Sequence, residues 1–344
     1  MADPGTSQTM QAVCVHETGI VVEGVAVPMP RAGEILVQVL RCGICGSDLH
    51  LYGASGKRSG VCPGHEILGR IAGNPPAASG FHRGDRVTIE ATRTCGHCLA
   101  CKRGDSQLCE ELQILGVHLP GGFAEFVVAQ TSQLHLIPER IDDAAGALAE
   151  PLAVALHAER VAGGVDGQRV LVIGAGSIGL LTAFVARQSG AAHVAITARR
   201  KQQREAAASL GVSEVLAPGG DGDGARFDIV FETVGGPNDA SLIEAIQRTR
   251  SGGRVVLLGL FAEAPRLPAL ELMSREIQLH GANCYGKGPA GPDFERAHAL
   301  LVEHGELLSG TLVTHSFMLA DFATALATAA DKTTGSIKVQ VRCC

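Results

Sequence analysis

The sequence has no tryptophan and only two tyrosines among its 344 residues. This scarcity argues against a site that stacks a large aromatic substrate. The chain also lacks an excess of positive charge, because its formal net charge is −6, which argues against nucleic acid or an anionic membrane as a partner. No apolar run reaches the roughly 18 to 20 residues of a membrane span, and the first residues carry neither the basic start nor the apolar stretch of a signal peptide. We therefore expect a cytoplasmic protein.

Cysteine, in contrast, occurs eleven times. Without an export signal we expect reduced thiols and metal ligands rather than a disulfide framework. Four of these residues, Cys95, Cys98, Cys101 and Cys109, follow the spacing C-x2-C-x2-C-x7-C, which fits a closed tetrahedral zinc site. Disulfides or free thiols are the alternative, but Cys-x2-Cys neighbours bridge each other poorly. The spacing predicts a structural zinc lobe over residues 94–110, so the chemistry must lie elsewhere.

The length and the texture of the chain predict two domains. Up to about residue 150, short apolar strands alternate with Gly/Pro turns, as in an irregular, barrel-like β domain. From about Gly167 onwards, strands and helices alternate, which indicates a βαβ series with a parallel sheet. Strands are expected at 35–40, 87–89, 123–128, 170–173, 193–197, 228–231, 254–258, 277–280 and 336–342, and helices at 178–188, 202–210, 242–250, 294–303 and 320–330.

A G-x-G-x-x-G sequence follows the expected buried strand 170–173 and opens the next helix. In this context the glycines allow a tight turn, the close approach of a pyrophosphate and helix–strand packing. The pyrophosphate would lie on the N-terminus of the helix, where N–H groups and the helix dipole favour an anion. A glycine-rich turn without a ligand is the alternative. The pattern predicts a doubly wound parallel Rossmann sheet in which the dinucleotide is bound by Gly174, Gly176, Ser177, Ile178 and Gly179.

The residues after the second strand of this sheet distinguish NAD(H) from NADP(H). A site for NAD(H) expects an acid roughly 20 positions after the glycines, to bind the ribose 2′-hydroxyl. Here the sequence reads Thr197-Ala198-Arg199-Arg200-Lys201, with three cations and no acid. Guanidinium groups bind a 2′-phosphate, which a carboxylate would repel. We expect Ala198, Arg199 and Arg200 to select NADP(H), the alternative being that both arginines merely solvate the helix start.

Three further segments carry the donor types of an open, catalytic zinc site, in which one position is kept for water or substrate. The first is a short turn at 42–50, the second is the G-H-E sequence at 64–66, and the third is an acid near the expected domain junction. Together they supply a thiol, a hydroxyl, imidazoles and carboxylates: Cys45, Ser47, Asp48, His50, His65, Glu66 and Glu150.

These motifs resemble the zinc-containing medium-chain alcohol/polyol dehydrogenase family over essentially the whole chain. G-I-C-G-S-D, G-H-E, the four-Cys lobe, E-P-L-A and G-x-G-x-x-G occur in that family's order and spacing, and the acid at 150 is the pattern of its sorbitol, threonine and butanediol dehydrogenase branch. The resemblance implies a GroES-like, mostly β catalytic domain at 1–152, a Rossmann domain at 153–287 and a return to the catalytic domain at 288–344. It also implies a homodimer or homotetramer that pairs through the edge strand near 277–282.

By this resemblance, Cys45 and His65 are ligands of a catalytic zinc. Glu66 is either a direct ligand or the acid that exchanges with one. Glu150 stands where liver-type alcohol dehydrogenases carry a third-ligand Cys. Glu66, Glu150 or a water therefore completes the coordination sphere, and these alternatives stay open.

The resemblance also implies a route for the proton. Ser47 matches the hydroxyl that takes the proton of the alcohol, and His50 matches the imidazole that passes it to solvent, since the pKa of a histidine lies near working pH. Asp48 is expected to orient His65, because imidazoles that bind a metal commonly donate their other N–H to a carboxylate. An aspartate that caps a turn is the alternative for Asp48.

The residues and the resemblance together predict an enzyme with two zinc ions per chain. It would transfer hydride between NADP(H) and a secondary alcohol or ketone, expected to be a polyol, a sugar alcohol or a cyclitol. The alternatives are a threonine- or butanediol-type dehydrogenase that uses NAD(H), and a nicotinamide-binding protein without activity. The walls of the substrate pocket are expected from residues 51–58, 113–121 and 283–292.

Overall fold

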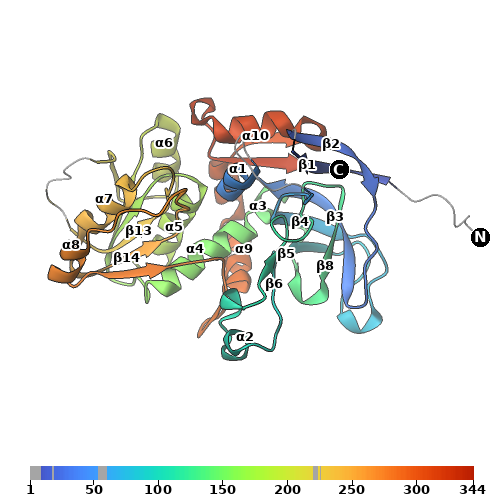
Figure 1. Cartoon of the computed structure of the whole chain (residues 1–344), viewed down its shortest axis with the longest axis horizontal. Coiled ribbons are helices and arrows are strands. Elements are labelled where there is room, and N and C mark those ends of the chain that lie inside the picture. The colour runs from blue at the N-terminus through green and yellow to red at the C-terminus, as the bar shows by residue number, and fades with distance from the viewer. Residues whose placement is uncertain (1–8, 18, 53–59, 220–223, 225) are drawn as a thin grey trace, which may run out of the picture. The chain divides into compact units, whose positions relative to one another are not determined.

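The computed structural model divides the chain into two compact units, residues 1–150 with 298–344 and residues 151–297. The structure describes residues 9–17, 19–52, 60–219, 224 and 226–344 (Figure 1). None of the helices among these residues is both long and apolar enough to cross a bilayer.

The second boundary lies at His298, ten residues after the predicted return at 288. Two helices contain the boundaries, α4 (Ala149–Val161) and α9 (Asp293–Leu312). The carboxylate of Asp293 accepts hydrogen bonds from the Arg160 guanidinium and the backbone N–H of Gly286. These bonds attach the first turn of α9 to the second unit. The sequence pattern alone does not predict such a long-range contact.

The first unit is built on a seven-stranded sheet in the order β18-β19-β3-β4-β5-β9, with β8 paired to β3. Along β3, Ile35, Val37 and Val39 are buried and alternate with less buried residues, as the two-residue period of a strand requires. This architecture agrees with the predicted mostly β domain. Its elements are β1 (Thr9–His16), β2 (Gly19–Ala26), β3 (Glu34–Gly43), α1 (Gly46–Tyr52), β4 (Glu66–Ile71), β5 (Arg86–Ile89), β6 (Thr92–Arg93), α2 (Leu99–Arg103), β7 (Gln113–Ile114), β8 (Phe126–Gln130), β9 (Leu134–Leu136), α3 (Asp143–Gly146), β18 (Val313–Met318), α10 (Phe322–Ala330) and β19 (Lys338–Arg342).

The second unit holds a six-stranded parallel sheet in the order β12-β11-β10-β13-β14-β15. In β10, the residues from Val170 to Ile173 are all buried, as expected for a strand covered on both faces. The sheet is the predicted doubly wound Rossmann sheet. Its elements are β10 (Arg169–Ile173), α5 (Ser177–Gln188), β11 (His193–Thr197), α6 (Lys201–Ser209), β12 (Glu214–Leu216), β13 (Phe227–Glu232), α7 (Ala240–Arg248), β14 (Thr249–Leu257), α8 (Ala269–Ser274), β15 (Gln278–Gly281), β16 (Lys287–Gly288) and β17 (Gly291–Pro292).

Several boundaries differ from the sequence-based expectation, and for two of them the backbone hydrogen bonds give the reason. The strand expected at 123–128 is β8, which begins at Phe126, because Phe123 bonds through its N–H to Pro63 instead of joining the ladder of β3. The helix expected at 242–250 is α7, which ends at Arg248, because Thr249 already pairs with Phe227 in β14. Neither shift moves a predicted site residue.

Candidate metal and dinucleotide sites

Cys45, His65 and Glu66 form a group whose donor atoms all lie within 4.8 Å of one another. Cys45 directly precedes α1, His65 directly precedes β4, and Glu66 is the first residue of β4. The antiparallel register of β3 and β4 sets Gly43 opposite Glu66 and so brings the two segments together. A side chain at position 43 would overlap the Glu66 carboxylate, so glycine is required there. Thiolate, imidazole and carboxylate are the donors that zinc prefers in a catalytic site, and the group therefore fits this ion.

Asp48 lies beside His65, with 3.9 Å between Asp48 Oδ1 and His65 Nδ1. The other oxygen of Asp48 accepts a hydrogen bond of 2.9 Å from the backbone N–H of Cys45, so the residue also caps this turn. Burial raises the pKa of Asp48, although His65 partly offsets the effect. Burial lowers the pKa of His65, but the charges of Asp48 and Cys45 outweigh it and hold that pKa well above its usual value. Asp48 Oδ1 and His65 Nδ1 are both buried and have no hydrogen-bond partner among the described residues, so they lie next to each other without a hydrogen bond.

Lys338 is part of this site, and the sequence-based analysis did not find it. It lies on β19, and its Nζ donates to Glu66 Oε1 at 2.6 Å, to Glu66 Oε2 at 2.8 Å and to the carbonyl of Ile44 at 3.1 Å. Both side chains are buried. Burial lowers the pKa of Lys338, but the Glu66 carboxylate outweighs it and raises that pKa above the usual value. The only signal in the sequence was a lysine within the expected strand 336–342. Its partner, Glu66, cannot be identified before the order of the strands in the sheet is known.

Glu150 is buried on α4, but it does not belong to the three-residue group within 4.8 Å. Burial raises its pKa to about 7, Glu66 adds to the rise, and His65 and Lys338 partly oppose it. The carboxyl group therefore feels the charges of the metal-site residues without lying among their donor atoms.

Ser47 and His50 lie on α1 three positions apart, which places them on the same face of the helix. Ser47 is partly buried and His50 is exposed. Along α1, the side chains therefore go from partly buried at Ser47, near Cys45, to solvent-exposed at His50.

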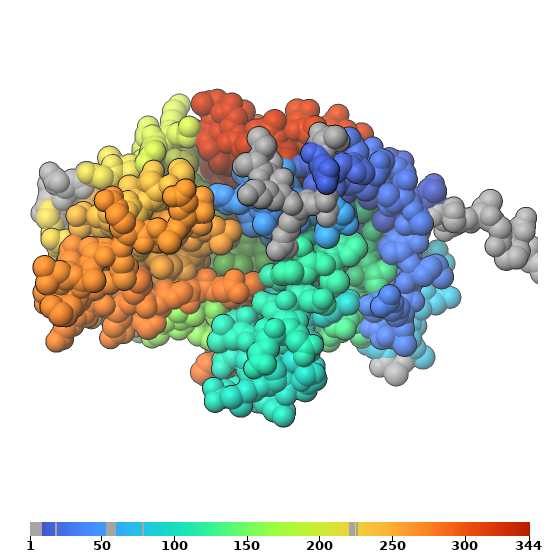
Figure 2. Space-filling view, in the orientation of Figure 1, coloured from blue at the N-terminus to red at the C-terminus, as the bar shows by residue number. Residues whose placement is uncertain are grey.

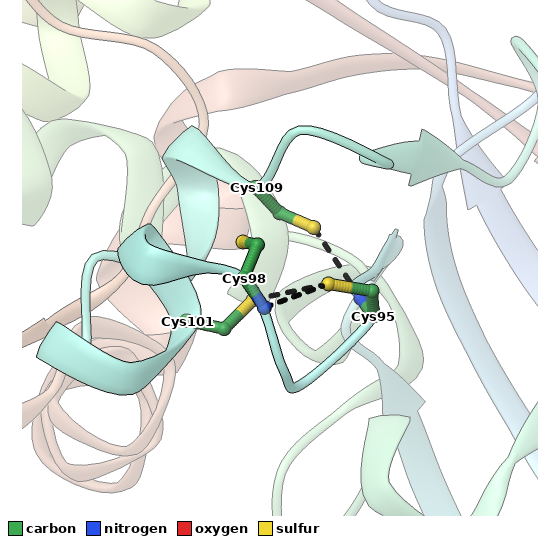
Figure 3. A group of neighbouring side chains, drawn as sticks. All are labelled: Cys95, Cys98, Cys101 and Cys109. Atoms are coloured by element: carbon green, nitrogen blue, oxygen red, sulfur yellow. Dashed lines mark hydrogen bonds between the residues drawn. The ribbon is translucent and has the colours of Figure 1, made fainter.

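The four cysteines of the lobe also form one group within 4.8 Å, and Figure 3 shows their side chains pointing to a common centre. Cys95 and Cys98 lie before α2, Cys101 lies within it, and Cys109 follows a short 3₁₀ turn. Figure 2 shows the lobe as a small protrusion on the first unit. Because so small a lobe has little apolar core of its own, it needs a cross-link such as a metal ion to stabilise its fold.

Backbone N–H groups point at the sulfur atoms of the lobe. Cys95 N lies 3.3 Å from Cys109 Sγ, and Cys98 N lies 3.3 Å from Cys95 Sγ. Backbone hydrogen bonds from Cys101 and Glu110 lower the pKa of Cys98 to about 6, whereas desolvation and the neighbouring thiols raise the pKa of Cys101 to about 11. A zinc ion among the four sulfur atoms would stabilise all of them as thiolates, and the donor set fits a structural zinc.

The glycine-rich turn lies where the sequence predicted it, between β10 and α5. Gly174 has a φ of +100°, which favours glycine, and Gly176 caps the N-terminus of α5. A side chain at Gly179 would overlap the carbonyl of Gly174, so the helix packs closely on the turn. The backbone N–H of Gly174 donates to Thr197 Oγ1 at 2.9 Å and thereby ties the turn to the end of β11. The first turn of α5 is thus oriented to receive a pyrophosphate.

Arg199 and Arg200 follow β11 at the same edge of the sheet. Ala198 is buried, Arg199 is exposed and Arg200 is partly buried. The amide oxygen of Gln203 accepts from the backbone N–H of both arginines. Neither guanidinium forms an ion pair with a described acid, whereas the neighbouring Lys201 pairs with Glu205 at 3.5 Å. Both cations therefore stay available for an anion.

The predicted walls of the substrate pocket are only partly described. Residues 53–58 of the first wall lie outside the described residues. In the second wall, the carbonyl of Gly116 accepts a hydrogen bond of 2.7 Å from the buried hydroxyl of Tyr52. In the third wall, Cys284 has a φ of +54°, which is unusual for a residue with a side chain.

Comparison with known proteins covers both units. The family model for the alcohol dehydrogenase GroES-like domain matches residues 31–139, and the model for zinc-binding dehydrogenases matches residues 177–303. The chain is similar to 2-dehydro-3-deoxy-L-galactonate 5-dehydrogenase of Pseudoalteromonas atlantica, with 32% identity over 321 residues that cover 89% of this chain and 91% of the relative. It is also similar to L-threonine 3-dehydrogenase of Pyrococcus horikoshii, with 35% identity over 271 residues that cover 74% of this chain and 77% of the relative.

A solved structure from Sinorhizobium meliloti 1021, which is bound to NADP, has a TM-score of 0.85 to this chain at 29% identity. The alignment covers 97% of this chain and 99% of that structure. The likeness therefore extends through both units rather than through the dinucleotide fold alone.

Proposed function

The chain belongs to the zinc-containing medium-chain dehydrogenase family, and from this premise we propose that it transfers hydride between NADP(H) and a secondary hydroxyl of a polyol-like substrate. As a member it is a zinc-dependent oxidoreductase of alcohols that uses a nicotinamide cofactor. The observation that carries the proposal is the group of Cys45, His65 and Glu66, whose donor atoms lie within 4.8 Å of one another. The substrate class extends from polyols, sugar alcohols and cyclitols to sugar acids, on which a named relative acts.

Two zinc ions per chain are part of the proposal. The four cysteines of the lobe hold one ion, and Cys45 and His65 hold the other, with Glu66, Glu150 or a water completing its sphere. Zinc held by these residues would supply Lewis-acid polarisation of the substrate oxygen, and a nicotinamide cofactor would supply or accept the hydride.

The residues around this zinc position supply orientation and a proton route. Asp48 Oδ1 lies 3.9 Å from His65 Nδ1 and would accept the Nδ1–H of a ring that binds the metal through Nε2. Ser47 takes the proton of the alcohol, and the exposed imidazole of His50 passes it to water. Lys338 neutralises Glu66 and so allows a carboxylate to lie buried beside the metal position.

The preference for NADP(H) rests on the end of β11. Arg199 and Arg200 stand there without an acid, and a guanidinium binds the 2′-phosphate through paired, charge-assisted bonds. The similarity to a structure bound to NADP supports this choice.

The test is hydride transfer by the purified protein, followed through nicotinamide absorbance. A panel of polyols, cyclitols, sugar acids, simple diols and L-threonine is offered with NADP+ and NAD+ in parallel. We expect turnover on a polyhydroxy substrate with a higher kcat/KM for NADP+. The Arg199→Ala/Arg200→Ala variant is expected to raise KM for NADP+ about tenfold, the loss of roughly one charge-assisted bond pair, and to leave KM for NAD+ unchanged. Lys201→Ala is the matched control, and a preference of the wild type for NAD+ would contradict the proposal.

A second candidate function is favoured by the similarity to an L-threonine 3-dehydrogenase. It differs in substrate and in cofactor, because the alternative is an amino alcohol with NAD(H). Turnover of L-threonine with NAD+, and none of a polyhydroxy compound, would select this alternative in the same panel.

We further propose that the protein is a homodimer or homotetramer that pairs through β15. This strand lies at the end of the six-stranded sheet, and the nearby helix α8 exposes Leu270 and Met273. An unpaired strand edge with exposed apolar side chains favours association. Light scattering after size-exclusion chromatography measures the mass, and a charged substitution in β15, Leu279→Lys, is expected to shift it to the monomer.

A further inference from the structure

The strand order of the second unit assigns each half of a bound dinucleotide to one side of the sheet. The order changes direction between β10 and β13, and ligands of such sheets bind outside the carboxyl ends of the strands at this point. The adenosine half belongs to the side of β11, because Arg199 and Arg200 follow that strand. The nicotinamide half therefore belongs to the side of β13 and β14.

The turn after β13 forms the wall on that side. Thr233 bonds through its N–H to the carbonyl of Ile173 at 3.1 Å, and its Oγ1 donates to the same carbonyl at 2.8 Å. On the other side, the backbone N–H of Gly236 donates to the carbonyl of Leu260 at 2.8 Å. Val234, between these anchors, is 50% exposed although it is apolar. The turn is thus fixed at both ends and presents an uncovered apolar side chain at the carboxyl edge of the sheet.

Glu232, the last residue of β13, holds the middle of this turn. Its Oε1 accepts hydrogen bonds of 2.9 Å from the backbone N–H groups of both Val234 and Gly235. The side chain is fully buried, and it forms no ion pair with any residue that the structure describes. Its second oxygen, Oε2, is buried without a hydrogen-bond partner among the described residues. A side chain at Gly259 would overlap this oxygen, so the carboxylate fills a space kept open by glycine.

A buried carboxylate with no cation beside it opposes folding. Such a group is expected where the shape of a functional segment depends on it, because local rules are broken chiefly at functional sites. Glu232 does not reach the ligand face, since its side chain is fully buried. Its contribution must therefore pass through the turn that it holds.

We propose that Glu232 is a positioning residue for the cofactor, which shapes the turn 233–236 to receive the nicotinamide half. The proposal rests on the proposed function only in requiring that a nicotinamide dinucleotide binds to this unit. Without the carboxylate, the N–H groups of Val234 and Gly235 lose their common acceptor and the turn loses its fixed shape. Binding of the adenosine half, which is expected beside Arg199 and Arg200 after β11, does not depend on this turn.

Direct binding measurements test this. The dissociation constants of NADPH and NADH are measured by calorimetry for the wild type, Glu232→Gln and Glu232→Ala, beside adenosine 2′,5′-bisphosphate and AMP, which lack the nicotinamide half. We expect Glu232→Ala to weaken binding of the full cofactors at least tenfold. Glu232→Gln is expected to weaken it about threefold, because a neutral amide oxygen still accepts both N–H groups but more weakly. Binding of the fragments is expected to stay within twofold.

Asp228→Asn is the matched control, because this carboxylate lies on the same strand and accepts from the backbone N–H of Arg169 at its other end. It is expected to bind the full cofactors and the fragments like the wild type. Unchanged binding of the full cofactors by the folded Glu232 variants would overturn the proposal, and so would an equal loss for cofactors and fragments. Failure of the wild type to bind either dinucleotide would instead overturn the proposed function. If Glu232→Ala does not fold, Glu232→Gln alone is read in the same way.

Discussion

The pair of Lys338 and Glu66 shows how one residue can hold another in a metal site. Each side chain is almost fully removed from water, and the two charges are compensated at 2.6 and 2.8 Å. Neither charge would be tolerated there alone, because the desolvation of a single buried ion exceeds what nearby dipoles return. The carboxylate beside the metal position is therefore neutralised in advance, and its position depends on a strand that lies 272 residues away in sequence.

Lys338→Met is expected to destabilise the zinc-free protein by about 3–5 kcal/mol, since it leaves the Glu66 carboxylate buried without its partner. The free energy of unfolding is measured in urea. Lys201→Met is the control, because Lys201 forms an exposed pair with Glu205 and its loss is expected to cost less than about 1 kcal/mol. Equal unfolding free energies for Lys338→Met and the wild type would contradict the role of this pair.

At the scale of the elements, α9 is joined to the sheet of the first unit by a partly buried polar network. His298 Nε2 lies 2.6 Å from Thr88 Oγ1 on β5, and the ring of His298 packs edge-on against that of His135 on β9. His135 in turn lies 3.1 Å from Glu90 Oε2. Burial and the neighbouring His135 lower the pKa of His298 to about 4.

This lowered pKa predicts a loss of stability in acid. Because the unfolded chain binds a proton near pH 6.5 and the folded state near pH 4, the contribution of His298 is complete above about pH 6.5 and falls as the pH drops to about 4. The loss amounts to about 3 kcal/mol across this window. The unfolding free energy of His298→Gln is expected to fall less steeply with decreasing pH than that of the wild type. His304→Gln, on the same helix, is expected to follow the wild type, and parallel curves for His298→Gln and the wild type would refute the assignment.

The zinc lobe is an element with almost no core, so its order is expected to depend on its metal. Cys98→Ser removes one of the four ligands and is expected to lower the zinc content from two ions per chain to one. Limited proteolysis is then expected to cleave between residues 94 and 110, while the rest of the chain resists. A variant that keeps two zinc ions and an intact lobe would disprove the structural role of this site.

At the scale of the whole molecule, the elements with a strong local pattern could be predicted from the sequence. The glycine-rich turn after β10 and the cluster of four cysteines could both be predicted, because the residues of each motif lie close together in the sequence. Cys45, His65 and Glu66 are also brought together as the motif order implied. Lys338, Glu232 and the attachment of α9 through Asp293 could not be predicted, since each depends on contacts set by sheet order or helix packing.

Glu150 remains one of three alternatives for completing the sphere of the proposed catalytic zinc. The motif places an acid at this position, and the structure buries it near the charges of the metal-site residues, but its carboxyl group is not among the three donors within 4.8 Å. Distances of a few ångströms decide coordination, and spacing along the chain does not contain them. The zinc content of Glu150→Gln, compared with that of Glu66→Gln, shows which of the two carboxylates binds the metal.

Zinc content and hydride transfer, measured for Cys45→Ser beside the wild type, decide whether Cys45 and His65 hold a catalytic zinc. We expect two zinc ions and NADP-linked turnover for the wild type, and one zinc ion and no turnover for the variant, with the lobe still loaded. Turnover by Cys45→Ser at the rate of the wild type, or two zinc ions in a variant that has lost this ligand, would contradict a catalytic zinc held by Cys45 and His65.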